Sequence, residues 1–315
     1  MKSARNLFLL SIAAWVALAW ASIHFGAADQ LDWQYVRDLR IPRVLLAGVI
    51  GAGLAIAGAV LQVVFSNALC EPYTLGISSG SAVGAVVGAA IGVPALAFGL
   101  AGSAFAGSLV FTLVLYAISH RKGMSQTTVL LAGVTLGFLG SSVVALTMAL
   151  SEGGGIQGAL IWLLGDLSRA RWSGLSVTAA GVLIVGVTLW SRWRELDALL
   201  LGEEGAASLG FPIRSIRARV IVMTSLLVSL CVSAGGMIGF VGLIVPHFAR
   251  RLVGAPHLRL LPLCAVWGAI ALTGADLLAR TVIRPYELPA GVVTALAGAP
   301  VFLWMMLRRH EAGRV

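Results

Sequence analysis

Long stretches without a charged residue follow one another along the whole chain. A bilayer core holds about 20 apolar residues per helix, and charges there are expensive, so each stretch predicts a membrane span. Two stretches are too long for one span, and we expect them to divide at Gly92-Val93-Pro94 and near Gly235-Gly236. Ten spans result. The charge-free stretches are residues 7–23, 44–66, 75–119, 124–151, 174–191, 220–249, 260–275 and 288–307, with Gln62 and His247 as polar exceptions.

The apolar runs have the character of helices. They lack the alternation of apolar and polar residues that a membrane β-barrel needs. The chain is 59% hydrophobic and 11% charged, with a mean hydropathy of +0.95, so a water-soluble core could not hide its apolar surface. No charged or Pro/Ser-rich linker divides it. The sequence therefore predicts an all-α membrane protein with about ten transmembrane helices, in which residues 1–315 form a single domain.

The basic residues indicate the orientation of the spans. With the N-terminus in the cytoplasm, all but seven of the 22 Lys and Arg residues fall on the cytoplasmic side, as the positive-inside rule requires. Both termini are therefore predicted to be cytoplasmic. The first 22 residues also resemble a signal peptide, and we favour a retained first helix. The net charge of +9 reflects topology and not nucleic-acid binding. The outer residues are Arg37, Arg40, Arg43, Arg169, Arg171, Arg280 and Arg284.

Residues 76–80 spell G-x-S-x-G, the pattern of a hydrolase nucleophile elbow. That turn requires a strand before it, whereas Ser78 stands among predicted membrane helices. We therefore reject a serine hydrolase. Small residues four apart allow close packing of membrane helices, which is the role that we expect for Gly76, Gly80, Gly84 and Gly88.

The sequence shows no energy source within the chain. Its only lysines, Lys2 and Lys122, do not fit a phosphate-binding loop, and Cys70, Cys231 and Cys264 lack metal-site spacing. We expect neither a bound cofactor nor a metal. An ion-coupled secondary transporter remains the alternative, although it would need an ionisable residue near the membrane midplane. The nearest candidate is Asp276, which is spaced to form an ion pair with Arg280.

Residues 191–219 form the longest hydrophilic segment on the cytoplasmic side, with helical turns separated by Gly202, Gly210 and Pro212. The segment could dock on a partner protein. It could also lie on the lipid surface, and the periodicity alone favours this second interpretation.

Eight motifs in order resemble the type II ABC importer permeases, the family that moves ferric siderophores, haem and cobalamin across the bacterial inner membrane. The likeness is nearly full length and implies the ten-span fold of that family. Ala68 and Cys70 depart from its usual Pro and Ala. The motifs are RIPRVLLAGVIGAGLAIAGAVLQ (40–62), NALCEPYTLGISSGSAVGA (67–85), LLAGVTLG (130–137), WLLGDLS (162–168), LGEEGAASLG (201–210), GGMIGFVGLIVPHFAR (235–250), GADLLAR (274–280) and ELPAGVVTALAGAPVFLW (287–304).

The resemblance implies partners and cargo. The expected assembly is a homodimer with two ATPase subunits, which bind ATP and Mg, and a periplasmic substrate-binding protein. It would lie in lipid at the bacterial inner membrane and bind no nucleic acid. The cargo would be a large metal chelate, with a ferric siderophore favoured over haem and cobalamin. The permease itself would not be an enzyme.

The resemblance also assigns roles to residues, and it reverses the preference for a lipid-surface segment at 191–219. Coupling helices are expected at about 195–212, and a cytoplasmic gate at the start of the fifth span. Gln126 is bulkier than the small hydroxyl residue usual at such a gate. The implied sites are ATPase coupling at Gly202, Glu203, Glu204, Ala206, Ala207 and Gly210, binding-protein docking at Arg40, Arg43 and Arg280, and the gate at Ser125, Gln126 and Thr127.

Overall fold

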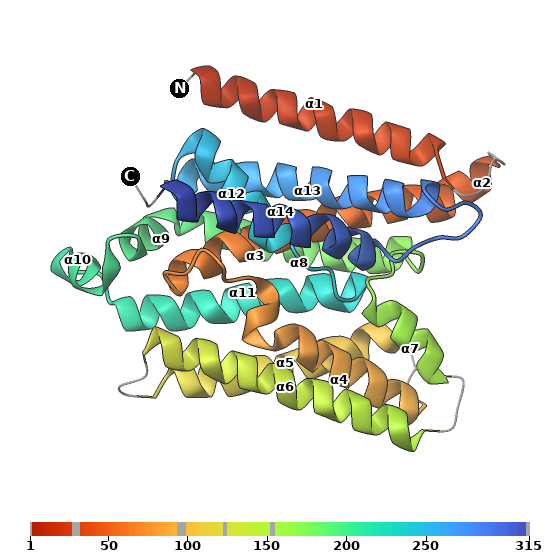
Figure 1. The fold of residues 1–315 in the computed structure, drawn as a ribbon, viewed down its shortest axis with the longest axis horizontal. Helices are drawn as coiled ribbons and strands as arrows, with labels where there is room; N and C mark the ends of the chain where they lie inside the picture. Colours follow the sequence, from red (N-terminus) through yellow and green to blue (C-terminus); the bar gives the residue numbers. More distant parts are fainter. Residues whose placement is uncertain (1, 27–31, 93–98, 122–124, 152–154, 313–315) are drawn as a thin grey trace.

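A computed structural model describes residues 2–26, 32–92, 99–121, 125–151 and 155–312 of the protein. All regular elements in these ranges are helices (Figure 1), which confirms the predicted fold class. Ten of them follow the predicted spans in order. They are α1 (Lys2–His24), α3 (Ile41–Val64), α4 (Ile77–Ala90), α5 (Gly99–Ser119), α6 (Gln126–Leu150), α8 (Trp172–Ser191), α11 (Ile213–Gly235), α12 (Val241–Val253), α13 (His257–Thr281) and α14 (Ala290–Ala312).

Eight of these ten helices are long and apolar enough to cross a membrane. The other two, α4 and α12, have 14 and 13 residues and are therefore about 20 Å long, against about 30 Å for the hydrocarbon core. The predicted break near Gly235-Gly236 is confirmed, because α11 ends at Gly235. The break predicted at Gly92-Val93-Pro94 lies partly outside the described residues.

Helix α3 lies at the centre of the bundle and packs against α13, α11, α12 and α8. It approaches α13 most closely at Gly51 and Gly268, where a Cβ atom on either residue would overlap the carbonyl oxygen of the other. Small residues permit this backbone contact between membrane helices. A second group, α4 with α5 and α6, packs beside α11 (Figure 1).

Short helices occupy both ends of the bundle. Helices α9 (Trp193–Leu199) and α10 (Gly202–Ser208) lie at the same end as the termini (Figure 1). The opposite end carries α2 (Trp33–Tyr35), the π-helix η1 (Val36–Arg40) and α7 (Gly155–Leu163). We call the end with α9 and α10 the coupling end, and the end with α2, η1 and α7 the outer end. The sequence patterns did not single out α7, which lies in a connection between spans.

The two short spans begin at breaks that contact each other. The chain between α3 and α4 contains the 3₁₀ helix η2 (Pro72–Leu75), and Glu71 stands just before it. The Glu71 carboxylate accepts a hydrogen bond of 3.3 Å from the backbone N–H of Phe240, the N-cap residue of α12. A carboxylate at a helix N-terminus satisfies a free donor and complements the helix dipole. Glu71 therefore caps a helix from a distant part of the chain.

Gln62, the polar exception in the second predicted span, is buried. Its side chain replaces a backbone hydrogen bond that a proline removes from another helix. Pro246 lies inside α12 and has no N–H to donate to the carbonyl of Gly242. The Gln62 Nε2 atom donates to the carbonyl oxygens of Leu243 (3.3 Å) and Gly242 (3.5 Å), and its Oε1 atom accepts from Arg250. A polar side chain thus replaces the missing helix bond at membrane depth.

Replacing Gln62 with leucine is expected to lower the free energy of unfolding by about 1–3 kcal/mol, because two carbonyls and a guanidinium each lose one hydrogen bond in a buried site. Chemical unfolding of the purified protein in detergent would measure the loss. Gln34→Leu is a matched control, since Gln34 is exposed and its side chain should be dispensable. Equal stability of the two variants would contradict this role for Gln62.

Candidate coupling, gate and docking sites

Helices α9 and α10 differ in how they meet the bundle. Leu196, Ala198 and Leu199 of α9 are buried, and α9 packs on α13 and α3. Helix α10 is more exposed, and the leucines beside it, Leu200, Leu201 and Leu209, are 45–61% exposed. Exposed apolar side chains of this kind are typical of a contact with a protein or with the membrane surface.

The predicted coupling residues are distributed unevenly over α10. Glu204, Ala207 and Gly210 are exposed, whereas Ala206 is fully buried. Gly202 and Gly210 both have a φ of +80°, a conformation that favours glycine, and they bound the helix. The Glu203 side chain lies outside the described residues. Contacts with a partner would therefore come from Glu204 and Ala207, while Ala206 fixes the helix to its own subunit.

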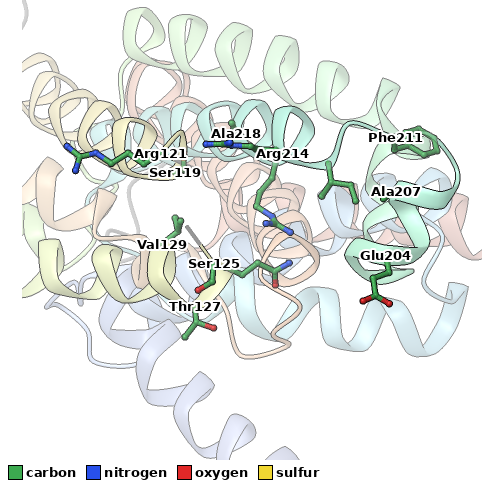
Figure 2. Close-up of a pocket in the computed structure, with 13 residues that line it drawn as sticks. Ser119, Arg121, Ser125, Thr127, Val129, Glu204, Ala207, Phe211, Arg214 and Ala218 are labelled. Atoms are coloured by element: carbon green, nitrogen blue, oxygen red, sulfur yellow. The ribbon is translucent and has the colours of Figure 1, made fainter. Parts of the chain in front are cut away.

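A cavity of about 890 Å³ opens at the coupling end among α5, α6, α10 and α11 (Figure 2). The three predicted gate residues, Ser125, Gln126 and Thr127, line it together with Glu204 and Ala207. Ser125 also caps α6, since its hydroxyl accepts the Thr128 N–H at 3.1 Å. Residues that the sequence assigned separately to a gate and to a coupling element therefore share one cavity.

Arginines contribute to this cavity in a way that the sequence analysis missed. Arg121, Arg214 and Arg217 line it, and Figure 2 shows Arg214 extending from α11 between Ser125 and Glu204. Arg214 also donates to the carbonyl of His120 at the end of α5 (2.6 Å). In the sequence these arginines indicate only the orientation of the spans. Their grouping depends on α5 and α11 meeting in space, which spacing along the chain does not reveal.

The three predicted docking arginines come together at the outer end. They line a cavity of about 120 Å³ with Glu287, but Arg40 and Arg280 are only 4% and 3% exposed. The Arg40 Nη1 atom donates to the carbonyls of Ile23 (2.9 Å) and His24 (3.2 Å) at the end of α1. These arginines therefore hold helix ends together inside the protein as well as lining the cavity.

Asp276 is the centre of this arginine cluster. The predicted ion pair with Arg280 is present at 3.0 Å, and Arg43 contacts the other carboxylate oxygen at 2.9 Å. Arg43 also pairs with Glu287 at 2.6 Å. The three guanidiniums and two carboxylates leave one positive charge, so the cluster suits an acidic partner. Because Asp276 holds two arginines near the outer end, it is a poor candidate for a midplane ion carrier.

The four packing glycines of α4 face two different neighbours. A Cβ atom at Gly80 or Gly84 would overlap the backbone of α5 at Gly107 or Ser103, and one at Gly76 would overlap Gly133 of α6. Gly76 also has a φ of +70° at the start of the helix. Gly88 is buried. Ser78, the serine of the hydrolase-like pattern, is 1% exposed within α4 and belongs to the packed interior.

The bundle of long apolar helices, with short helices and a cavity at one end, is that of a multi-pass membrane permease. A sequence model of the FecCD transport family matches residues 5–308. The chain belongs to this family and is a type II ABC importer permease, which confirms the resemblance seen in the sequence.

Individual relatives agree with this assignment. The vitamin B12 import system permease protein BtuC of Vibrio cholerae is 41% identical over 290 residues, which cover 91% of this chain and 87% of the relative. The hemin transport system permease protein HmuU of Yersinia pestis is 35% identical over 300 residues, covering 94% and 90%. A solved inward-facing conformation of a metal-chelate type ABC transporter is 32% identical and matches with a TM-score of 0.88, covering 96% of this chain and 99% of that one.

Proposed function

We propose that this permease moves a large metal chelate into the cytoplasm by ATP-driven alternating access. The observation that carries the proposal is the coupling-end cavity, where the gate residues Ser125, Gln126 and Thr127 lie beside Glu204 and Ala207 of α10. A partner that displaces α10 would therefore change the shape of this cavity directly. Such a displacement would open or close the cytoplasmic side of the path.

The proposed assembly is a homodimer with two ATPase subunits at the coupling end and one binding protein at the outer end. ATP and Mg are bound by the ATPase subunits. The exposed leucines beside α10 support the first contact, and the positive charge of the arginine cluster supports the second. The protein would lie in the bacterial inner membrane with both termini cytoplasmic, as the distribution of Lys and Arg favours.

The cargo is proposed as a metal chelate from the names of the similar proteins, one for vitamin B12, one for hemin and one for a metal-chelate type transporter. The sequence alone favoured a ferric siderophore. The identity of 41% to a vitamin B12 permease makes cobalamin the first cargo to test, with haemin and ferric siderophores beside it.

Reconstitution tests the proposed function. The permease, its ATPase and its binding protein are placed in proteoliposomes, and uptake of cobalamin, haemin and ferric siderophore is followed with ATP. We expect uptake of one chelate that needs ATP and the binding protein and survives an ionophore. Uptake that stops with the ionophore and ignores ATP would support an ion-coupled secondary transporter instead.

Replacing the exposed Ala207 with arginine is expected to weaken the contact with the ATPase by about tenfold or more, because a charged side chain would enter an apolar interface. Co-purification of the ATPase with the permease measures the contact. Ala255→Arg is the control, since Ala255 is also exposed and lies in the connection between α12 and α13 at the coupling end. Equal recovery of the ATPase by both variants would remove α10 from the interface.

The proposed docking of the binding protein on Arg40, Arg43 and Arg280 involves two buried side chains, Arg40 and Arg280. Charge reversal at Arg40 and Arg280 should weaken capture of the binding protein in a pull-down, but it would also place acids beside backbone carbonyls. The pull-down therefore needs a parallel measurement of folding. Capture should also slow as salt rises, since charge pairs of this kind mainly steer association.

A further inference from the structure

Helix α9 stands between the exposed helix α10 and the transmembrane helix α13. Only Leu200 and Leu201 separate α9 from α10, while Leu196 of α9 is fully buried and α9 packs on α13. A displacement of α10 therefore acts directly on α9. Whether α9 transmits this displacement to α13 depends on the contacts between the two helices.

A partly buried polar contact joins α9 to α13. The Asp197 Oδ1 atom accepts the backbone N–H of His257 at 2.8 Å and lies 2.6 Å from the His257 Nδ1 atom. His257 is the first residue of α13 and is fully buried. The N-cap residue of α13, Pro256, makes no side-chain capping bond, so Asp197 supplies from α9 the cap that α13 lacks.

A second hydrogen bond joins the end of α8, which directly precedes α9, to α13. Pro262 lies inside α13 and cannot donate to the carbonyl of Leu258, which is four residues before it. The indole N–H of Trp190, in the last turn of α8, donates to that carbonyl at 3.1 Å. The end of α8 and helix α9 are therefore both attached to the first turn of α13, each through a backbone group that α13 itself leaves free.

At its other end, α13 carries the centre of the arginine cluster. Its 25 residues span about 37 Å, and Asp276 and Arg280 lie near its outer end, paired with each other and with Arg43 of α3. The backbone contact between Gly51 and Gly268 keeps α3 and α13 together between the two ends. One continuous helix thus connects the coupling end to the outer end.

We propose that Asp197, His257 and Trp190 are positioning residues that make α9 and α13 move together, so that displacement of the coupling helices reaches the arginine cluster at the outer end. This inference rests on the proposed function, because it takes α10 as the element that the ATPase displaces. The three residues touch neither nucleotide nor cargo. Their loss should reduce the stimulation of ATP hydrolysis by the binding protein and leave basal hydrolysis unchanged.

The complete transporter in proteoliposomes tests the link through three rates: basal ATP hydrolysis, hydrolysis stimulated by the loaded binding protein, and uptake of the imported chelate. Asp197→Ala and His257→Ala should each reduce stimulation and uptake by about fivefold or more, the usual range for coupling between sites. Basal hydrolysis should stay near the wild-type rate. The double variant should be no worse than Asp197→Ala, because Asp197 is the only partner that His257 has in this contact, whereas His257→Ala keeps the backbone N–H that Asp197 accepts.

Matched variants separate this role from general damage. Asp197→Asn keeps an oxygen that can accept the His257 N–H, so it should behave as wild type. Glu195→Ala removes another carboxylate from α9, one of similar exposure that forms ion pairs with Arg192 and Arg219 instead of with α13, and coupling should survive. If Asp197→Ala couples as well as Glu195→Ala in a transporter that imports its chelate, the link is overturned while the proposed function stands.

Trp190→Phe keeps the proposal testable if the alanine variants do not fold. It retains an aromatic ring but removes the indole N–H together with part of the ring, so stimulation by the binding protein should fall by at least the roughly twofold to tenfold expected for one hydrogen bond. Wild-type stimulation in this variant would contradict the link. A wild-type transporter that imports none of the chelates with ATP would instead refute the proposed function itself.

Discussion

Replacing Gly84 with leucine is expected to leave little folded protein in the membrane. A Cβ atom at Gly84 would overlap the carbonyl of Ser103, and one at Gly107 would overlap the backbone at Gly80 and Gly84. Helices α4 and α5 therefore touch backbone to backbone, and any side chain must force them apart. Overpacking costs about 1–3 kcal/mol where side chains can adjust, and here only the backbone can move.

Yield and a monodisperse profile in size-exclusion chromatography would measure the effect of Gly84→Leu. Gly174→Leu is the matched control, because nothing lies within 4 Å of a Cβ atom at Gly174, and it should purify as wild type. Ser78→Ala on the same helix should also leave folding and transport intact. Normal yield of Gly84→Leu would mean that α4 and α5 are not packed as described.

Replacing Asp276 with alanine is expected to cost about 3–5 kcal/mol in the free energy of unfolding, the usual loss when one partner of a buried ion pair is removed. The Asp276 side chain is fully buried between Arg43 and Arg280. Without it, the hydrogen-bond partners described for Arg280 are neutral groups of Ser22 and Phe25. The outer ends of α1, α3 and α13 would then lose the charge that holds them together.

Denaturant titration in detergent would measure this loss. Asp38→Asn provides the control, because Asp38 pairs with Arg37 at the surface, where both side chains are 46% exposed or more, and such pairs contribute about 1 kcal/mol or less. If Asp276→Ala and Asp38→Asn unfolded at the same denaturant concentration, the cluster at the outer end would not be a stabilising feature. Its arginines would then be free to serve docking alone.

The sequence predicted the spans well because their signal is local. Charge-free runs gave all ten helices in order, and Gly235-Gly236 marked the break between α11 and α12. The short length of α12 was harder to predict, since its start is capped by the contact between Glu71 and Phe240. These residues are 169 positions apart, and no pattern along the chain joins them.

The candidate sites were predictable to different degrees. The i, i+4 pair of Asp276 and Arg280 lies within one helix and was visible in the sequence, whereas the contact of Arg43 with Asp276 crosses 233 positions. Motif likeness predicted a gate and coupling residues, whose roles stay predictions; the structure brings several of them to one cavity, whereas Ala206 is buried. No sequence motif marks Asp197, His257 or Trp190. These residues come together only where α8, α9 and α13 meet.

The contact between Gln62 and α12 has an evolutionary consequence. The amide of Gln62 is needed because Pro246 leaves the carbonyl of Gly242 without its helix bond. A chain with another residue at 246 would restore that bond and make an amide at 62 redundant. Across homologues, positions 62 and 246 should therefore substitute together, and the two sites, 184 positions apart in sequence, should evolve as one.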